Sequence, residues 1–150
     1  MTHLDEVRAA NKELVKTKPF VAVFGGGTSG IGECGVQQLA ATFGDDGDGL
    51  RVYIVGQNMD AAEKIIADCR QICPAGGFKF LKGDLALIKE VDRICAEITQ
   101  AKQMRTKIQG TAAKIDLLVL CQGILAFSGP VYTEEGLDKY TSLFYYSQMR

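Results

Sequence analysis

The chain has 150 residues, the usual length of one domain, with 47% hydrophobic and 23% charged residues, which argues against a disordered protein. Its 17 Lys and Arg and 18 Asp and Glu give a net charge of -1, so no basic surface for nucleic acid is expected. The sequence shows neither signal-peptide order nor an apolar run of membrane-spanning length, so we expect a cytoplasmic protein without a membrane partner.

A lead-in helix and then four strands, each followed by a helix, are predicted along the chain. Apolar runs rich in β-branched and aromatic residues predict the strands, and apolar residues three or four positions apart predict the helices. The predicted strands are residues 20–24, 50–55, 78–81 and 115–120, and the predicted helices are residues 4–16, 31–43, 60–73, 84–109 and a last one from about 133. Asp60 is the expected cap of the helix that it begins.

Two apolar faces are expected to anchor the first helices. Leu4, Val7, Leu14 and Val15 share one side of the lead-in helix, and Ile31 begins the apolar spacing of the next one. Between that helix and the second strand, the aspartates of the glycine-rich loop 44–49 lack the length and terminal Glu of an EF-hand, which favours a solvated turn over a calcium site.

The cysteines give no sign of a disulfide framework or a metal site. There are five, with no CxxC pair, and the single histidine, His3, is far from them in the sequence. We therefore expect reduced thiols that pack as small apolar groups.

Alternation of strands and helices requires crossover connections between parallel strands. The predicted fold class is therefore α/β: a three-layer, Rossmann-type (doubly wound) parallel sheet of four strands with helices on both faces. We expect residues 1–150 to form a single domain, with 1–18 as its lead-in. In such a sheet the end of the first strand lies beside the point where strand order reverses and ligands bind.

The run GGGTSGIG follows the first predicted strand and begins a helix. A pyrophosphate at a helix N-terminus meets free backbone N–H groups and the positive end of the helix dipole. Gly26 would form the tight turn, Gly30 would let the backbone approach the phosphates, and Gly32 would let the helix pack closely. Thr28 and Ser29 add hydroxyl donors. A glycine trio alone is weak evidence, but its place between strand and helix predicts a dinucleotide site.

The spacing of this run, ending Gly30-Ile31-Gly32, resembles the TGxxxGIG signature of short-chain dehydrogenases/reductases, with Gly25 where that family usually has threonine. Three later stretches resemble family motifs in order: 83–85 its adenine-contacting Asp, 116–123 its D-x-L-V-N-N-A-G stretch, and 133–138 the start of its next helix. The resemblance covers nearly the whole chain. It implies an NAD(P)-dependent dehydrogenase or reductase acting on an unassigned small organic substrate.

Cofactor choice is governed by the end of the second strand, where a carboxylate would bind the ribose 2′-OH of NAD. Gln57 and Asn58 stand there without an acid, which favours NADP, but no Lys or Arg is present at that strand end and NAD stays open. Asp84 could accept from the adenine amino group, act as a helix cap, or do both. The nominated cofactor-binding residues are Gly26, Thr28, Ser29, Gly30, Ile31, Gly32, Gln57, Asn58, Asp84, Leu85 and Gly123.

Departures from the family pattern concern the catalytic region. Leu120, Cys121 and Gln122 stand where the family has Asn-Asn-Ala, and Phe144 stands about where its helix carries Asn. The family's catalytic Ser and Tyr-x-x-x-Lys pair would fall beyond Arg150, so we expect a shortened chain that does not complete the chemistry alone. The hydroxyls of Ser128, Tyr132, Tyr140, Tyr145 and Tyr146 receive no catalytic assignment.

The stretches GGGTSGIGE, LCQG and EEGLDKY resemble a divergent branch of the family found among fungal secondary-metabolite genes. The alternative is a non-catalytic nucleotide-binding or protein-interaction module. Its exposed element would be the strand around residues 117–120, an open apolar edge through which two copies could associate as a homo-oligomer.

Overall fold

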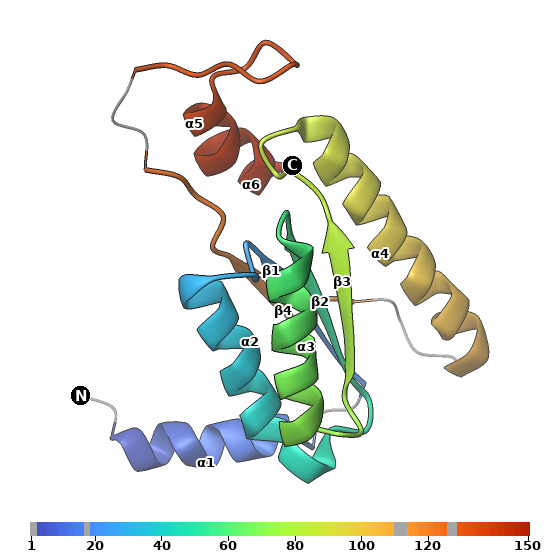
Figure 1. The fold of residues 1–150 in the computed structure, drawn as a ribbon. Coiled ribbons are helices and arrows are strands. Elements are labelled where there is room, and N and C mark those ends of the chain that lie inside the picture. Colours follow the sequence, from blue (N-terminus) through green and yellow to red (C-terminus); the bar gives the residue numbers. More distant parts are fainter. Residues whose placement is uncertain (1–2, 17–18, 110–113, 126–128) are drawn as a thin grey trace.

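The structure is a computed structural model that describes residues 3–16, 19–109, 114–125 and 129–150. Helices and strands alternate along the chain (Figure 1). The elements are α1 (Leu4–Leu14), β1 (Phe20–Gly25), α2 (Gly30–Phe43), η1 (Gly44–Asp46), β2 (Leu50–Gly56), α3 (Met59–Ile72), β3 (Gly77–Lys82), α4 (Ile88–Gln109), β4 (Leu117–Leu120), α5 (Lys139–Thr141), η2 (Ser142–Tyr146) and α6 (Ser147–Met149).

The four strands form one parallel sheet in the order β3-β2-β1-β4. Phe24 of β1 is aligned with Ile54 of β2 on one side and with Val119 of β4 on the other. The chain leaves β1 toward β2 and β3 and later crosses back to place β4 on the opposite side, so strand order reverses at β1. This confirms the predicted α/β sheet and places the glycine turn at the switch point.

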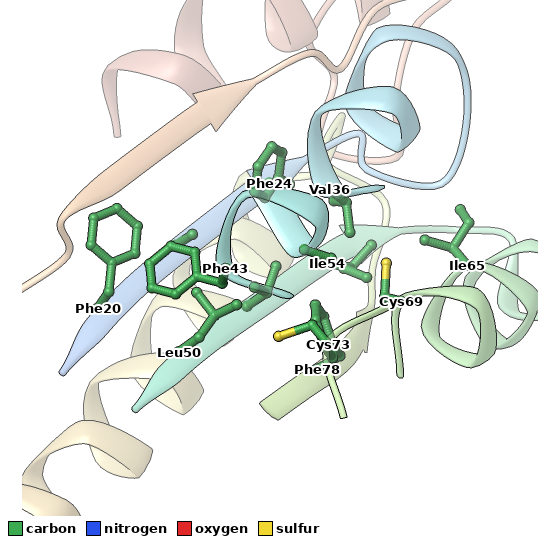
Figure 2. Packing of buried hydrophobic residues seen from close by; sticks show 13 residues of the cluster. Phe20, Phe24, Val36, Phe43, Leu50, Ile54, Ile65, Cys69, Cys73 and Phe78 are labelled. Carbon is green, nitrogen blue, oxygen red and sulfur yellow. The ribbon is translucent and has the colours of Figure 1, made fainter. Parts of the chain in front are cut away.

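One face of the sheet is covered by α2 and α3, which lie side by side in Figure 1. Phe24 and Ile54 project from the sheet into the cluster drawn in Figure 2, where Val36 of α2 and Ile65 of α3 meet them. Cys69 belongs to the same cluster as a buried thiol, and burial raises its pKa to about 11. The apolar residues of the strands and those of α2 and α3 thus form one buried hydrophobic layer.

On the opposite face, α4 packs over β2 and β3 through Ile94 and Ile98, which contact Tyr53 and Val55. This cover is incomplete over β4, because the burial of that strand alternates and Leu118 is 56% exposed. Among the described strands, β4 pairs only with β1, so it forms an edge of the sheet.

The prediction that the apolar residues of the first helix share one packed side is wrong. The helix ends at Leu14, and Leu4 is 62% exposed, whereas Val15 just beyond the helix contacts the core. In Figure 1, α1 extends away from the sheet, which leaves its beginning without a partner layer. Ile31 is also 82% exposed, because the first turn of α2 lies at the carboxyl edge of the sheet rather than over its face.

Two predicted helix starts are corrected by their capping contacts. Asn58, not Asp60, caps α3: its backbone is extended, and its Oδ1 accepts a hydrogen bond from Ala61 N at 3.1 Å. The helix predicted from Asp84 begins only at Ile88, since the Asp84 carboxylate accepts from Ala86 N at 2.9 Å and closes a separate turn. Asp84 therefore caps this turn and not α4.

The last helix was predicted to begin near residue 133 and actually begins at Lys139. Residues 131–138 form a tight turn instead, closed by a bridge between Tyr132 and Asp138, with Gly136 at φ +76°. The Asp138 carboxylate then accepts from Thr141 N and caps the helical stretch 139–149.

The aspartates of the loop 44–49 are exposed, and no group of three or more His, Cys, Asp or Glu side chains that could hold a metal is found in the described part. Within the same ranges, no helix has both the length and the apolar character needed to cross a membrane.

Candidate functional site

A cleft opens at the carboxyl edge of the sheet, where the turns after all four strands meet the C-terminal helical stretch. It is lined by Gly26, Thr28, Ser29, Gly56, Gln57, Asn58, Gly83, Leu85, Cys121, Gln122, Gly123, Ile124, Lys139 and Leu143. Among the residues that the structure describes, the lining contains no carboxylate and only one cationic side chain, that of Lys139.

The glycine turn is built so tightly that side chains are excluded from its inner positions. Gly26 has φ +74°, and a Cβ on it would lie 2.6 Å from Gln122 N. A Cβ on Gly32 would lie 2.3 Å from the carbonyl oxygen of Gly26, so the first turn of α2 rests directly on the glycine loop. By contrast, a Cβ on Gly30 would have nothing within 4 Å, which leaves the outer side of the turn open to a ligand.

Ser29 is the N-cap of α2, with an extended backbone at φ -162° and no capping hydrogen bond from its side chain. The first N–H groups of a helix have no carbonyl partner within it, and the helix dipole adds positive potential at that end. Ser29 lines the cleft. The residues present therefore fit an anionic diphosphate, which such a helix start can bind without a basic side chain.

The second strand supplies the neighbouring wall. A Cβ on Gly56 would lie 2.8 Å from the hydroxyl oxygen of Thr28, so the glycine turn and the end of β2 are in contact. Gln57 and Asn58 follow as uncharged, exposed residues, and the Asn58 side chain also holds the start of α3.

Of the eleven nominated cofactor residues, seven line this cleft: Gly26, Thr28, Ser29, Gln57, Asn58, Leu85 and Gly123. Gly30, Ile31 and Gly32 lie on the same turn but outside the lining, and the Asp84 carboxylate is engaged by Ala86 N. The proximity of the seven is a finding, and their contact with a cofactor stays a prediction.

Sequence reasoning missed Gly56, Gly83, Cys121, Gln122, Ile124, Lys139 and Leu143. Gly56 directly follows the predicted strand 50–55, and Gly83 lies two residues after the predicted strand 78–81, so their position could have nominated them. Lys139 and Leu143 carry no local signal, because only the path of the chain after β4 brings them to the cleft.

Gln122 joins the end of β4 to the C-terminal helix. Its side chain is buried, and Nε2 donates to Ser147 Oγ at 3.2 Å. Its Oε1 is buried without a hydrogen-bond partner in the described part of the chain. A Cβ on Gly25 would lie 2.8 Å from this oxygen, so Gln122 uses the space that a side chain at position 25 would need.

The C-terminal wall of the cleft is attached to the start of α4. The Glu135 carboxylate accepts from Ile88 N at 2.7 Å and from Lys89 N at 3.0 Å, which caps that helix from 47 residues away. Ser142 Oγ donates to the carbonyl of Ala86 at 2.6 Å. These contacts hold residues 135–142 above the connection between β3 and α4.

A second contact joins the end of the chain to α4. Arg150 donates to both carboxylate oxygens of Asp92, at 2.7 and 3.0 Å, and this hydrogen bonding lowers the pKa of Asp92. Both groups are exposed to solvent, so the pair orients the chain end more than it stabilises the fold.

The candidate hydroxyls do not form a catalytic group. Tyr140 stacks near Phe144 with ring centroids 4.5 Å apart, and Tyr145 meets Tyr146 edge-on at 5.4 Å. None of these tyrosines lines the cleft. Ser128 lies outside the described residues.

The sheet order and the glycine-lined cleft define the class as a Rossmann-type α/β protein. No protein-family model matches the chain. It is 41% identical over its whole length to the short-chain dehydrogenase/reductase SAT2 of Stachybotrys chartarum, of which it covers 42%, and 33% identical over its whole length to the oxidoreductase AN1596 of Emericella nidulans, of which it covers 41%. The chain thus spans about two fifths of the length of these curated relatives.

Solved structures agree on the fold. The Pseudomonas aeruginosa RhlG/NADP active-site complex matches with a TM-score of 0.60 at 21% identity, over 88% of this chain and 44% of that one. The chain is therefore similar over its whole length to a short-chain dehydrogenase/reductase, and it shares the fold of the RhlG complex.

Proposed function

We propose that the chain binds a nicotinamide dinucleotide in the cleft and provides the nucleotide-binding part of an NAD(P)-dependent dehydrogenase or reductase. The observation that carries the proposal is the glycine turn, whose open side and helix start meet the ends of the other strands in one cleft. Support comes from the RhlG complex, which contains NADP, and from fungal relatives named as oxidoreductases. We also propose that residues 1–150 act as one domain and that the protein serves secondary-metabolite biosynthesis.

In this function the N-terminus of α2 and the hydroxyls of Thr28 and Ser29 bind the diphosphate. Gln57 and Asn58 border the adenosine ribose, and Gly123 lies at the far end of the cleft. A bound cofactor supplies hydride transfer. The described residues bind and orient it, and proton transfer to a small organic substrate is assigned to none of them.

Ser29→Asp gives a sharp test. Asp is as good an N-cap as Ser, and its negative charge interacts favourably with the positive end of the helix dipole. The variant is therefore expected to fold at least as well as the wild type. Its carboxylate faces the cleft and repels a diphosphate, so titration calorimetry should show binding of NADPH and NADH weakened by at least about tenfold. The control is His3→Asp, which also introduces an aspartate at a helix N-cap, that of α1, but outside the cleft lining.

If the wild-type chain bound neither NADPH nor NADH, the result would contradict the proposal. Equal binding by Ser29→Asp and wild type would show that the ligand does not use the start of α2.

The second candidate is a protein-interaction module, favoured by the open edge at β4, where Leu118 is 56% and Leu120 37% exposed. Open apolar strands pair with other chains. Light scattering of the isolated chain over a concentration series checks this candidate, since a stable monomer at all concentrations would count against it.

A further inference from the structure

The end of β2 lacks the group that would choose between the two dinucleotides. NADP differs from NAD by a phosphate on the adenosine ribose, and a phosphate group is bound best by a cationic donor. Gln57 and Asn58 are neutral, and no acidic residue of the described part of the chain lines the cleft to repel a phosphate. The charge that recognises this phosphate, if present, must come from elsewhere in the lining.

Lys139 is the one cationic side chain among the described residues of the lining. It is half-buried, and none of the ion pairs in the described part of the chain includes it. The adjacent Asp138 is used differently: its Oδ1 accepts from the N–H and the hydroxyl of Thr141, at 2.9 and 3.0 Å. The ammonium group of Lys139 is therefore free for a ligand.

Lys139 lies on the wall of the cleft that is attached to the connection after β3. Its backbone N–H donates to the carbonyl of Val131 at 2.7 Å, and Ser142, three residues later, is held on Ala86. Ala86 lies in the connection after β3, two strands from β1 on the side of β2. In this fold the adenosine ribose lies by the end of the second strand, and the diphosphate lies at the glycine turn after β1.

We propose that Lys139 is the residue through which the cleft selects a dinucleotide that carries a phosphate on the adenosine ribose. The proposal rests on the proposed function and adds to it the cofactor preference and its cause. Lys139 binds the ribose phosphate, while the N-terminus of α2 binds the diphosphate that both dinucleotides share.

The test uses the full 150-residue chain and four probes: adenosine 2′,5′-bisphosphate, ADP, NADPH and NADH. Calorimetry compares wild type with Lys139→Gln, and with Lys82→Gln as the control. Lys82 is an exposed lysine at the end of β3 outside the lining, so its variant changes the same charge near the same edge. A charge-assisted hydrogen bond is at stake, so Lys139→Gln should weaken binding of the bisphosphate and of NADPH by about tenfold or more. ADP and NADH, which lack that phosphate, should bind Lys139→Gln as they bind wild type, and Lys82→Gln should change none of the four.

Lys139→Arg keeps the charge and guards against a loss of folding, so it should retain the preference for NADPH. Equal weakening of all four probes by Lys139→Gln would place the lysine on the adenosine 5′-phosphate that all four share and overturn the inference, as would no weakening at all. Loss of the preference in a folded Lys139→Arg would also overturn it. Failure of the wild-type chain to bind any probe would instead remove the proposed function on which the inference rests.

Discussion

Gly25 and Gln122 occupy one volume between them, and a double-mutant cycle can measure that coupling. The family pattern that the chain resembles has threonine at position 25 and alanine at position 122. This chain has Gly25 and Gln122, so the larger side chain of the pair stands at position 122 and not at position 25. The perturbation is Gly25→Thr, alone and together with Gln122→Ala. Gly25 is absent from the glycines with positive φ, so its backbone accepts a threonine and only the space is at issue.

The expected energies follow from the contacts. A Cβ at Gly25 would lie 2.8 Å from Gln122 Oε1 and 3.1 Å from Leu120 Cδ2. The amide is tied to Ser147, so Gly25→Thr should lower the free energy of unfolding by about 1–3 kcal/mol. Gln122→Ala loses the hydrogen bond to Ser147 but also removes the unpartnered oxygen, and should cost about 1 kcal/mol. In the double variant the threonine enters the vacated space. We therefore expect the double variant to be more stable by about 1–2 kcal/mol than the sum of the two single losses would give.

The assay is urea unfolding followed by circular dichroism, since the chain has no tryptophan. Ala67→Gly, on the exposed side of α3, serves as the control partner and should be additive with Gln122→Ala. A coupling between Gly25→Thr and Gln122→Ala below about 0.5 kcal/mol would refute the shared volume.

Three further changes test separate contacts. Glu135→Gln removes the charge that caps α4 and should lower the free energy of unfolding in urea by about 1 kcal/mol, whereas an unchanged midpoint would mean that the cap is idle. The pKa of the buried Cys69 thiol is raised to about 11 from 9.0, so this thiol should resist iodoacetamide at neutral pH while the exposed Cys34 is alkylated. Because the folded state holds the Cys69 proton more tightly than the unfolded state, the contribution of this thiol to the free energy of unfolding is full below pH 9.0 and declines as pH rises toward 11. Chemical unfolding at several pH values measures this decline. Gly32→Ala places a Cβ 2.3 Å from a backbone oxygen and should lower the free energy of unfolding by about 3 kcal/mol in the same urea assay. Gly30→Ala, where only the positive φ opposes the change, should cost about 1 kcal/mol. A larger loss for Gly30→Ala than for Gly32→Ala would contradict the tight turn.

The strands and most helices could be predicted because their signals are local. The apolar run that forms β1 was expected over residues 20–24 and is observed as Phe20–Gly25, and the glycine turn follows it as the spacing indicated. The helix starts were less predictable, since capping depends on single side chains. Asn58 and Asp60 are two residues apart and both suit an N-cap, and only the observed backbone shows which side chain accepts the hydrogen bond.

The cleft was predictable where a local motif marks the end of a strand. Thr28 and Ser29 lie in the glycine turn and were nominated from the sequence. Lys139 reaches the cleft because the chain after β4 returns to the start of α4, and Glu135 secures that return by a contact across 47 residues. No periodicity or spacing contains that information. The helix predicted from about residue 133 begins only at Lys139, after the turn that Tyr132 and Asp138 close.

The C-terminal helical stretch shapes the cleft through a residue that does not line it. Ser142 is fully buried, and its hydroxyl donates to the Ala86 carbonyl at 2.6 Å, so Ser142→Ala leaves a buried acceptor unpaired at a cost of about 1–3 kcal/mol. Because this hydrogen bond is one of the few that join the stretch to the sheet side, the loss should be local: amide exchange across residues 139–149 should accelerate, while the strands stay protected. Thr141→Ala, which removes a surface hydroxyl that donates to Asp138, is the matched control and should leave exchange in those residues nearly unchanged. If Ser142→Ala accelerates exchange equally in β1 and β2, the stretch unfolds only together with the sheet. The wall that carries Lys139 would then be an inseparable part of the domain rather than a movable side of the cleft.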